Sequence, residues 1–280
     1  MRKAVQQMML GSVLKSEDSA KQILKEIKEA GYDSVELNRY MIHPTPLMVR
    51  MLTKAAGMPS GNGGKYDWPA LVKEAGLEVL SLHTDLGSLE KNFEEVVKDA
   101  KSFGTKYVVV TGMYRFDYQK EEAVRGLAKR LNECGEKLKA EGLNLLYHNH
   151  NIELVKVNAE TSAYSLLIRE TNPEYVNFEL DTYWMTEGGA DAKQIMRKLG
   201  KRMKLWHVTD RGFRLEKTSM TPIVKTDSVE LGTGNMDLAG MAEIAEENGV
   251  EGAVLETHRN WIHNDPVESI KVSAEYIKRL

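Results

Sequence analysis

The sequence contains a single cysteine, Cys134, among its 280 residues. One thiol cannot form a disulfide within the chain. Cys134 lies in a charged amphipathic stretch with no base nearby in the sequence, which is typical of a half-buried helical thiol rather than a nucleophile. A disulfide scaffold is excluded, and a reducing, cytoplasmic environment is expected.

Long runs of one charge sign and long apolar runs are also missing. Lysine and arginine total 38, aspartate and glutamate total 41, and the formal net charge is -3. No basic stripe suggests nucleic acid as a partner. No window approaches the roughly 18 apolar residues of a membrane span, and the N-terminus lacks an apolar signal core. The expected protein is soluble, has no nucleic-acid or membrane partner, and is free to form a homo-oligomer.

What the sequence does contain is a regular alternation of short β-like runs with longer helix-periodic segments. This alternation is typical of parallel βαβ units. The expected helices are 19–30, 89–103, 121–140, 159–170, 192–199, 238–248 and 266–278. The eight expected strands are 4–10, 34–38, 78–83, 107–111, 144–148, 176–181, 204–209 and 252–257.

Eight such units in 280 residues fit one closed (β/α)8 barrel over residues 1–280 better than an open doubly wound sheet. Two irregular stretches, 39–67 and 210–236, follow strands 2 and 7. In a barrel, the loops after the strands build the active-site face, so both stretches are candidates for a lid or a specificity loop.

Acidic and imidazole side chains stand at the ends of six expected strands. They are Glu36, His83, His148 with His150, Asp181, His207 and Glu256. Burying so many ionisable groups without partners would cost several kcal/mol, and a divalent cation removes that cost. Mixed carboxylate and imidazole ligands suit Mn, Co, Zn, Fe or Mg. Taken alone, the two histidines at the end of strand 5 are equally explained as partners of buried backbone groups.

The motifs around these positions resemble those of the xylose isomerase-like TIM-barrel superfamily, in its sugar phosphate isomerase/epimerase branch. The motifs are Tyr147-His148-Asn149-His150-x-x-Glu153, Leu180-Asp181-Thr182, Trp206-His207-Val208-Thr209-Asp210, Leu231-Gly232-Thr233-Gly234 and Leu255-Glu256. The resemblance implies one divalent metal held at the ends of strands 5 to 8. The implied ligands are Glu153, Asp181, His207 and Glu256.

The chain departs from the family pattern at strand 5. His148 occupies the strand end where many relatives have the glutamate, and Glu153 follows five residues later. Glu153 is taken as the ligand, with His148 or His150 as its substitute. Whichever imidazole does not bind metal is a candidate acid or base.

The same resemblance implies a catalytic set and a substrate-binding set. Glu153, Glu256, His150 and His148 form the catalytic set. The substrate-binding set is Glu36, His83, Trp184, Trp206 and Asp210. Glu36 and His83 are equally explained as capped strand ends. Trp184, Trp206, Trp261 and Tyr183 lie beside ligand positions, where they form either a wall against a sugar ring or packing at the barrel mouth.

The expected activity is a metal-dependent sugar isomerase or epimerase that removes a proton next to a carbonyl and forms an enediolate. The alternative is a dehydratase or lyase on a keto-sugar or inosose. A barrel that only binds sugar would lack metal ligands, and all four ligand positions are filled.

An apurinic endonuclease is not expected, because Trp184 stands where such enzymes have a histidine after the strand-6 aspartate. Gly232-x-Gly234 is either a phosphate-binding turn or an ordinary loop.

Overall fold

Eight parallel strands form a closed barrel in the order β1-β10-β7-β6-β5-β4-β3-β2 in this computed structural model. The structure describes residues 1–44, 64, 66–215 and 217–280. The barrel strands are β1 Arg2–Gln6, β2 Ser34–Asn38, β3 Glu78–Thr84, β4 Tyr107–Thr111, β5 Asn144–His148, β6 Val176–Asp181, β7 Met203–Val208 and β10 Gly252–Leu255. The predicted (β/α)8 barrel is confirmed.

The predicted strand 4–10 is wrong in its second half. β1 ends at Gln6, and Gln7–Leu10 form a 3-10 helix, η1. The side chain of Gln6 accepts a hydrogen bond from the backbone N–H of Met8 at 3.0 Å. This contact caps η1 and ends β1 at Gln6, although apolar residues continue to Leu10.

Helices connect the strands. They are α1 Glu17–Ala30, α2 Arg39–Ile42, α4 Trp68–Glu74, α5 Leu86–Lys91, α6 Phe93–Ser102, α7 Glu121–Ala140, α8 Ala163–Glu170, α9 Thr182–Glu187, α10 Ala192–Leu199, α11 Leu238–Asn248 and α12 Pro266–Ile277, with 3-10 turns η3 Ile152–Leu154, η4 Gly200–Arg202 and η5 Ile262–Asn264. The helix expected at 89–103 is two helices, because the backbone of Asn92 is not helical. The helix expected from residue 159 begins at Ala163, where the Ser162 side chain caps it. Among the described residues, no helix combines the length and the apolar character that a membrane crossing requires.

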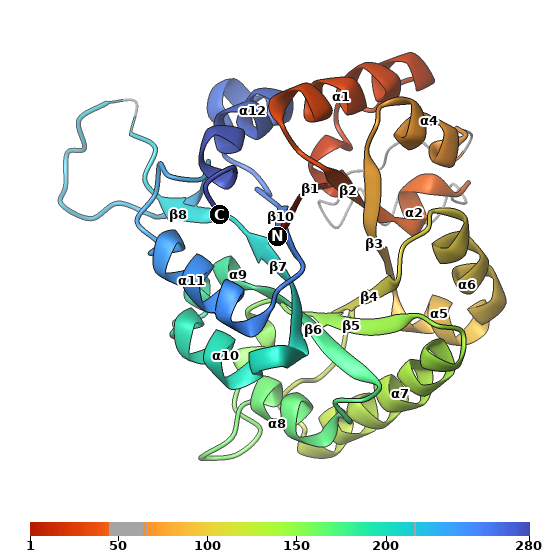
Figure 1. The fold of residues 1–280 in the computed structure, drawn as a ribbon. Coiled ribbons are helices and arrows are strands. Elements are labelled where there is room, and N and C mark those ends of the chain that lie inside the picture. The colour runs from red at the N-terminus through yellow and green to blue at the C-terminus, as the bar shows by residue number, and fades with distance from the viewer. Residues whose placement is uncertain (45–63, 65, 216) are drawn as a thin grey trace. The chain divides into compact units, whose positions relative to one another are not determined.

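The chain divides into two compact units. Unit 1 is Met1–Val79, His207–Ala242 and Gly252–Leu280, and unit 2 is Leu80–Trp206 and Glu243–Glu251. In unit 1, α1 lies beside α12 (Figure 1). α1 buries Ala20, Ile23, Leu24 and Ile27, which share one face because they are three or four residues apart.

In unit 2, α7 packs against β5 and α8 (Figure 1). Its buried face includes Val124, Leu131 and Cys134. The thiol of Cys134 is therefore a core group, and burial raises its pKa to about 11. At neutral pH the thiol stays protonated, as expected for a structural cysteine.

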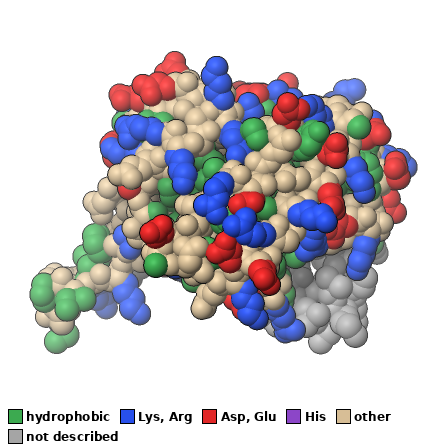
Figure 2. Space-filling view, turned by 90° about the horizontal axis from the view of Figure 1, so that it is seen from below, with side chains coloured by type: hydrophobic (Ala, Val, Ile, Leu, Met, Phe, Trp, Pro, Cys, Tyr) green, Lys and Arg blue, Asp and Glu red, His purple; other side chains and the backbone are tan. Residues whose placement is uncertain are grey.

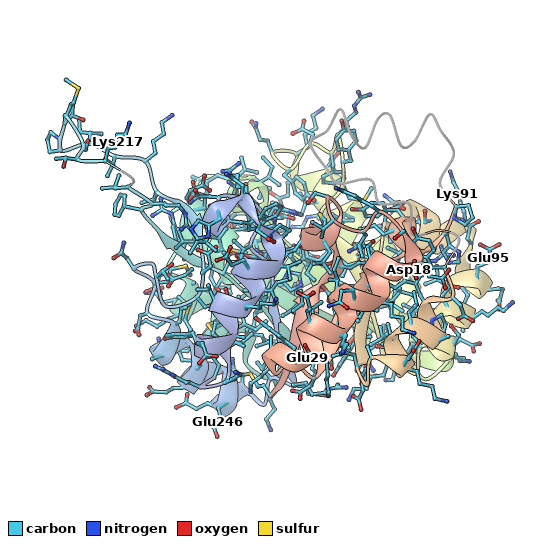
Figure 3. The ribbon with its side chains drawn as sticks, turned by 90° about the horizontal axis from the view of Figure 1, so that it is seen from above. Asp18, Glu29, Lys91, Glu95, Lys217 and Glu246 are labelled. Carbon is cyan, nitrogen blue, oxygen red and sulfur yellow. The ribbon has the colours of Figure 1, made fainter. Side chains whose placement is uncertain are left out.

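The two long loops differ in how far they are described. Most of 39–67 lies outside the described residues, after α2. The stretch 210–236 contains an antiparallel hairpin of β8 Asp210–Gly212 and β9 Asp227–Val229, which the sequence analysis missed. The segment between β8 and β9 extends outward at Lys217 (Figure 3) and exposes Met220 and Ile223. Figure 2 shows acidic and basic side chains intermingled on the displayed face, as the sequence predicts.

Candidate metal centre

The polar residues predicted at the strand ends are buried in the structure. None of Glu36, His83, His148, Asp181, His207 and Glu256 exposes more than 5% of its surface. The apolar strand residues that precede them fill the core, which fixes the side chains at the strand ends in place. Buried ionisable groups require partners.

In unit 1, His207 lies between two carboxylates. Its Nδ1 atom is 2.8 Å from Oε2 of Glu256, and its Nε2 atom is 2.7 Å from Oε1 of Glu36. Nε2 of His258 is 3.7 Å from the same Glu256 oxygen. Burial lowers the pKa of His258, which favours its neutral form.

Two amide side chains that sequence reasoning missed complete this cluster. Gln6 donates from Nε2 to Oε1 of Glu36 at 2.6 Å, and Asn38 donates from Nδ2 to Oε1 of Gln6 at 2.5 Å. A signal for Asn38 was present. It stands two residues after Glu36 in a strand, so both side chains point to the same face of the sheet.

In unit 2, Glu179 joins two histidines. Oε2 of Glu179 is 2.8 Å from Nε2 of His83 and 3.8 Å from Nδ1 of His148. One donor atom from each of the three residues lies within 4.8 Å of the other two. Sequence reasoning missed Glu179 as well, although it precedes Asp181 by two positions on β6 and therefore shares its face. The backbone N–H of Trp184 donates to Oδ1 of Asp181 at 2.8 Å, so Asp181 also caps α9.

Glu153 lies in a different environment. Its Oε1 accepts from the Tyr147 hydroxyl at 2.8 Å, and its Oε2 accepts from the backbone N–H of His150 at 3.0 Å. Adjacent strand residues point to opposite faces, so Tyr147 and His148 point away from each other. Among the described residues, the clusters of possible metal donors include His148 and not Glu153. Burial raises the pKa of Glu153 to about 7, although these hydrogen bonds oppose the rise.

His150, by contrast, is partly exposed. Its ring centroid is 5.1 Å from that of His148 and 5.8 Å from that of Trp184. The predicted acid or base in this segment thus lies beside the predicted aromatic wall.

Two predicted substrate-binding residues make internal contacts. Trp206 is fully buried, and its indole N–H donates to Thr182 Oγ1 at 2.9 Å. Asp210 accepts backbone N–H groups from Gly232 and Gly234 with Oδ2 at 3.0 and 2.9 Å. Arg211 and Met236 donate to its Oδ1 at 2.8 and 3.1 Å. The glycine amides considered for phosphate are therefore engaged by a carboxylate of the chain itself.

The remaining aromatic residues of the predicted wall differ in exposure. Tyr183 is buried, while Trp184 and Trp261 are partly exposed. The indole N–H of Trp261 donates to the carbonyl of Thr257 at 2.7 Å. Trp184 and Trp261 thus retain surface for contact with a ligand, and Tyr183 belongs to the packing.

Comparison with known proteins places the fold among known barrels. An inosose dehydratase from Mesomycoplasma hyopneumoniae (strain J) is 22% identical over 286 residues, covering 92% of this chain and 88% of that protein. A sugar phosphate isomerase/epimerase structure from Parabacteroides distasonis has a TM-score of 0.77 at 22% identity, covering 99% of this chain and 93% of that one. The IolI protein with a bound zinc atom has a TM-score of 0.69 at 15% identity, covering 100% and 97%. The model of the xylose isomerase-like TIM barrel matches residues 24–280, so the chain belongs to the xylose isomerase-like TIM-barrel family.

Proposed function

We propose that this protein is an enzyme that holds one divalent metal and removes a proton next to the carbonyl of a sugar-like substrate. The observation that carries the proposal is His207, buried between the carboxylates of Glu36 and Glu256. Imidazole and carboxylate groups such as those of His207 and Glu256, which stand at the ends of barrel strands, are the donor types that bind divalent cations.

The proposed ligands are His148, Asp181, His207 and Glu256. Asp181, His207 and Glu256 are three of the four ligands that the sequence motifs imply. His148 takes the place first assigned to Glu153, whose two oxygens are held by Tyr147 and by the backbone of His150.

The donor set fits a metal ion. Two imidazoles and two carboxylates suit Zn, Mn, Co or Fe, and the protein of similar fold with bound zinc supports a transition metal over Mg. When bound, a divalent cation supplies the positive charge that stabilises an enolate oxygen. Removal of the proton falls to side chains of the chain itself.

For that proton transfer we assign His150 and Glu256. His150 is partly exposed beside Trp184, so its ring can reach both solvent and a bound substrate. Glu256 is buried, and its Oε2 lies 2.8 Å from Nδ1 of His207. Trp184 offers an apolar ring against which the carbon face of a sugar packs.

Isomerisation or epimerisation is the first outcome we propose for this chemistry. Dehydration is the second, and the position of Glu153 favours it. Epimerisation with two carboxylate bases on opposite faces of the substrate would use Glu153 with Glu256, yet Glu153 is bonded to Tyr147. Loss of water needs only one base and one acid. The inosose dehydratase relative, which matches 92% of this chain, supports the same outcome.

Incubation with ketoses, keto-inososes and 3-keto-glycosides in deuterated water tests the function. Protein loaded with Mn, and shown to hold it, would be followed by NMR and mass spectrometry. Epimers or aldose–ketose pairs support the first outcome, and loss of water supports the second. Since a shielded base can return the same proton, product is scored beside deuterium uptake. Absence of both across the panel would contradict proton abstraction as the function.

A further inference from the structure

Glu36 contacts the proposed metal centre through His207. Its Oε1 atom lies 2.7 Å from Nε2 of His207 and accepts from Nε2 of Gln6 at 2.6 Å. Glu36 and His207 are both fully buried. A carboxylate at this distance from an imidazole nitrogen holds a proton on that nitrogen and fixes the plane of the ring.

The orientation of Glu36 is itself fixed by two further side chains. Oε1 of Gln6 accepts from Asn38 Nδ2 at 2.5 Å and from the backbone N–H of Met8 at 3.0 Å. With its oxygen occupied by donors, the amide of Gln6 must present its NH2 group to Glu36. The order of contacts is therefore Asn38 to Gln6, Gln6 to Glu36, and Glu36 to His207.

This arrangement assigns separate roles to the two nitrogens of His207. A metal binds the lone pair of an imidazole nitrogen, so the ligating nitrogen carries no proton and the other nitrogen does. Nδ1 faces Oε2 of Glu256, another proposed ligand, at 2.8 Å, whereas Nε2 faces Glu36. With a cation held by both Glu256 and His207, Nδ1 would give up its proton and Nε2 would keep the proton that it donates to Glu36.

We infer that Glu36 is a positioning residue for the metal centre rather than a substrate-binding residue. It fixes His207 in the form protonated on Nε2 and directs Nδ1 toward the cation, with Gln6 and Asn38 holding the carboxylate in place. Carboxylates that orient a ligating histidine in this way typically contribute 10- to 100-fold to metal affinity. The inference rests on the proposed function, since it requires a metal at His207.

Metal affinity measured by competition with a chromophoric chelator is the direct test. Glu36→Ala is expected to weaken Zn or Co binding by roughly 10- to 100-fold. Glu36→Gln keeps an acceptor for the Nε2 proton but loses the charge, so its loss is expected to be smaller, about 10-fold. Gln6→Met leaves the Glu36 carboxylate in place but removes the hydrogen bond that Gln6 donates to it. A still smaller loss of metal affinity is expected. The visible spectrum of bound Co should shift in Glu36→Ala, because the ring of His207 is no longer fixed.

A matched control is Glu251→Gln. Glu251 is likewise a carboxylate held by a hydrogen bond, which it accepts from the hydroxyl of the buried Tyr107 at 2.6 Å, and no contact with His207 is described for it. Its substitution is expected to leave metal affinity and the Co spectrum unchanged. Unfolding of the metal-free variants distinguishes a general loss of stability from a specific loss of affinity.

The outcomes separate this inference from the proposed function. Unchanged metal affinity in Glu36→Ala and Glu36→Gln, together with a raised KM, would show that Glu36 binds substrate and would overturn the inference while the function stands. Metal binding that weakens as expected in a protein without turnover on any sugar would leave the inference standing and count against the proposed chemistry. No metal binding by the unmodified protein would overturn both.

Discussion

The hydroxyl group of Tyr147 donates a hydrogen bond to Oε1 of Glu153 at 2.8 Å. The same hydroxyl lies 3.0 Å from that of Tyr118, which accepts from the backbone N–H of Met113 at 2.8 Å. Glu153 therefore ends a buried chain of hydroxyl groups on the opposite side of β5 from His148. Its proposed role is to anchor the segment that carries His150, since its other oxygen accepts from the backbone of that residue.

Metal uptake is the first measurement that should separate Glu153 from His148. Glu153→Gln is expected to retain one metal per chain, because Gln can still accept from Tyr147. His148→Gln is expected to lower the stoichiometry well below one, because it removes a proposed ligand. Elemental analysis of both variants after Zn or Mn addition checks this. Loss of metal in Glu153→Gln with full loading of His148→Gln would restore Glu153 as the ligand.

The pH dependence of stability should also change in Glu153→Gln. Burial raises the pKa of Glu153 to about 7 in the folded protein, above its ordinary value of about 4.3 in the unfolded chain. The folded state therefore binds this proton more tightly. Protonation of Glu153 therefore adds to the free energy of unfolding. This contribution is fully present below pH about 4 and is lost as the pH rises through about 7.

A glutamine at this position does not titrate. The stability of Glu153→Gln relative to the unmodified protein should therefore rise by roughly 2–3 kcal/mol between pH 5 and pH 8. Urea unfolding of both metal-free proteins at the two pH values measures this difference. An equal difference at pH 5 and pH 8 would mean that Glu153 has an ordinary pKa.

Substitution of Asp210 should act on stability rather than on substrate affinity. Its two oxygens accept four backbone N–H groups, including those of Gly232 and Gly234. Asp210→Asn loses the charge and one acceptor, so a loss of roughly 1–3 kcal/mol is expected. Denaturant unfolding measures the loss, and steady-state kinetics should show little change in KM. A large rise in KM without loss of stability would support the substrate-binding role first assigned to Asp210.

Two glycines offer a matched pair of alanine substitutions. A Cβ atom on Gly234 would lie 2.3 Å from Oδ1 of Asp210 and 2.6 Å from the carbonyl oxygen of Arg211. Gly234→Ala is therefore expected to cost roughly 1–3 kcal/mol. Gly126 is exposed within α7 with nothing within 4 Å of its Cβ position, so Gly126→Ala should stabilise the protein by roughly 0.5–1 kcal/mol. Thermal unfolding of the two variants should shift in opposite directions.

The loop between β8 and β9 should be a site of tryptic cleavage. Lys217 and Lys225 are both exposed there, and the loop follows the strand that carries His207. If this loop closes over substrate, as its position predicts, a tight-binding sugar should slow the cleavage. Mass spectrometry of the fragments with and without sugar measures the effect. Equal cleavage rates would count against a lid.

The sequence by itself determined the barrel. Strand and helix periodicity fixed eight βα units, since each apolar strand must be covered by a helix with one apolar face, and β2, β4, β5 and β6 begin and end where the pattern predicts. It also identified which strand ends carry ionisable groups. The pattern placed the end of β1 wrongly, because the hydrogen bond from Met8 to the Gln6 side chain has no periodic signal in the sequence. It also missed the break between α5 and α6, because the non-helical backbone of Asn92 has no such signal either.

Only the tertiary structure decided what each ionisable residue contacts. Glu153 is near His148 in sequence but bonds to Tyr147, because alternation along β5 separates the two faces of the strand by a single residue. Glu36 and Glu256 come from strands far apart in the chain and contact the same histidine, because the barrel brings β2, β7 and β10 to one rim. Residue types are local properties of a sequence, but hydrogen-bond partners depend on packing between distant segments, which no local pattern records.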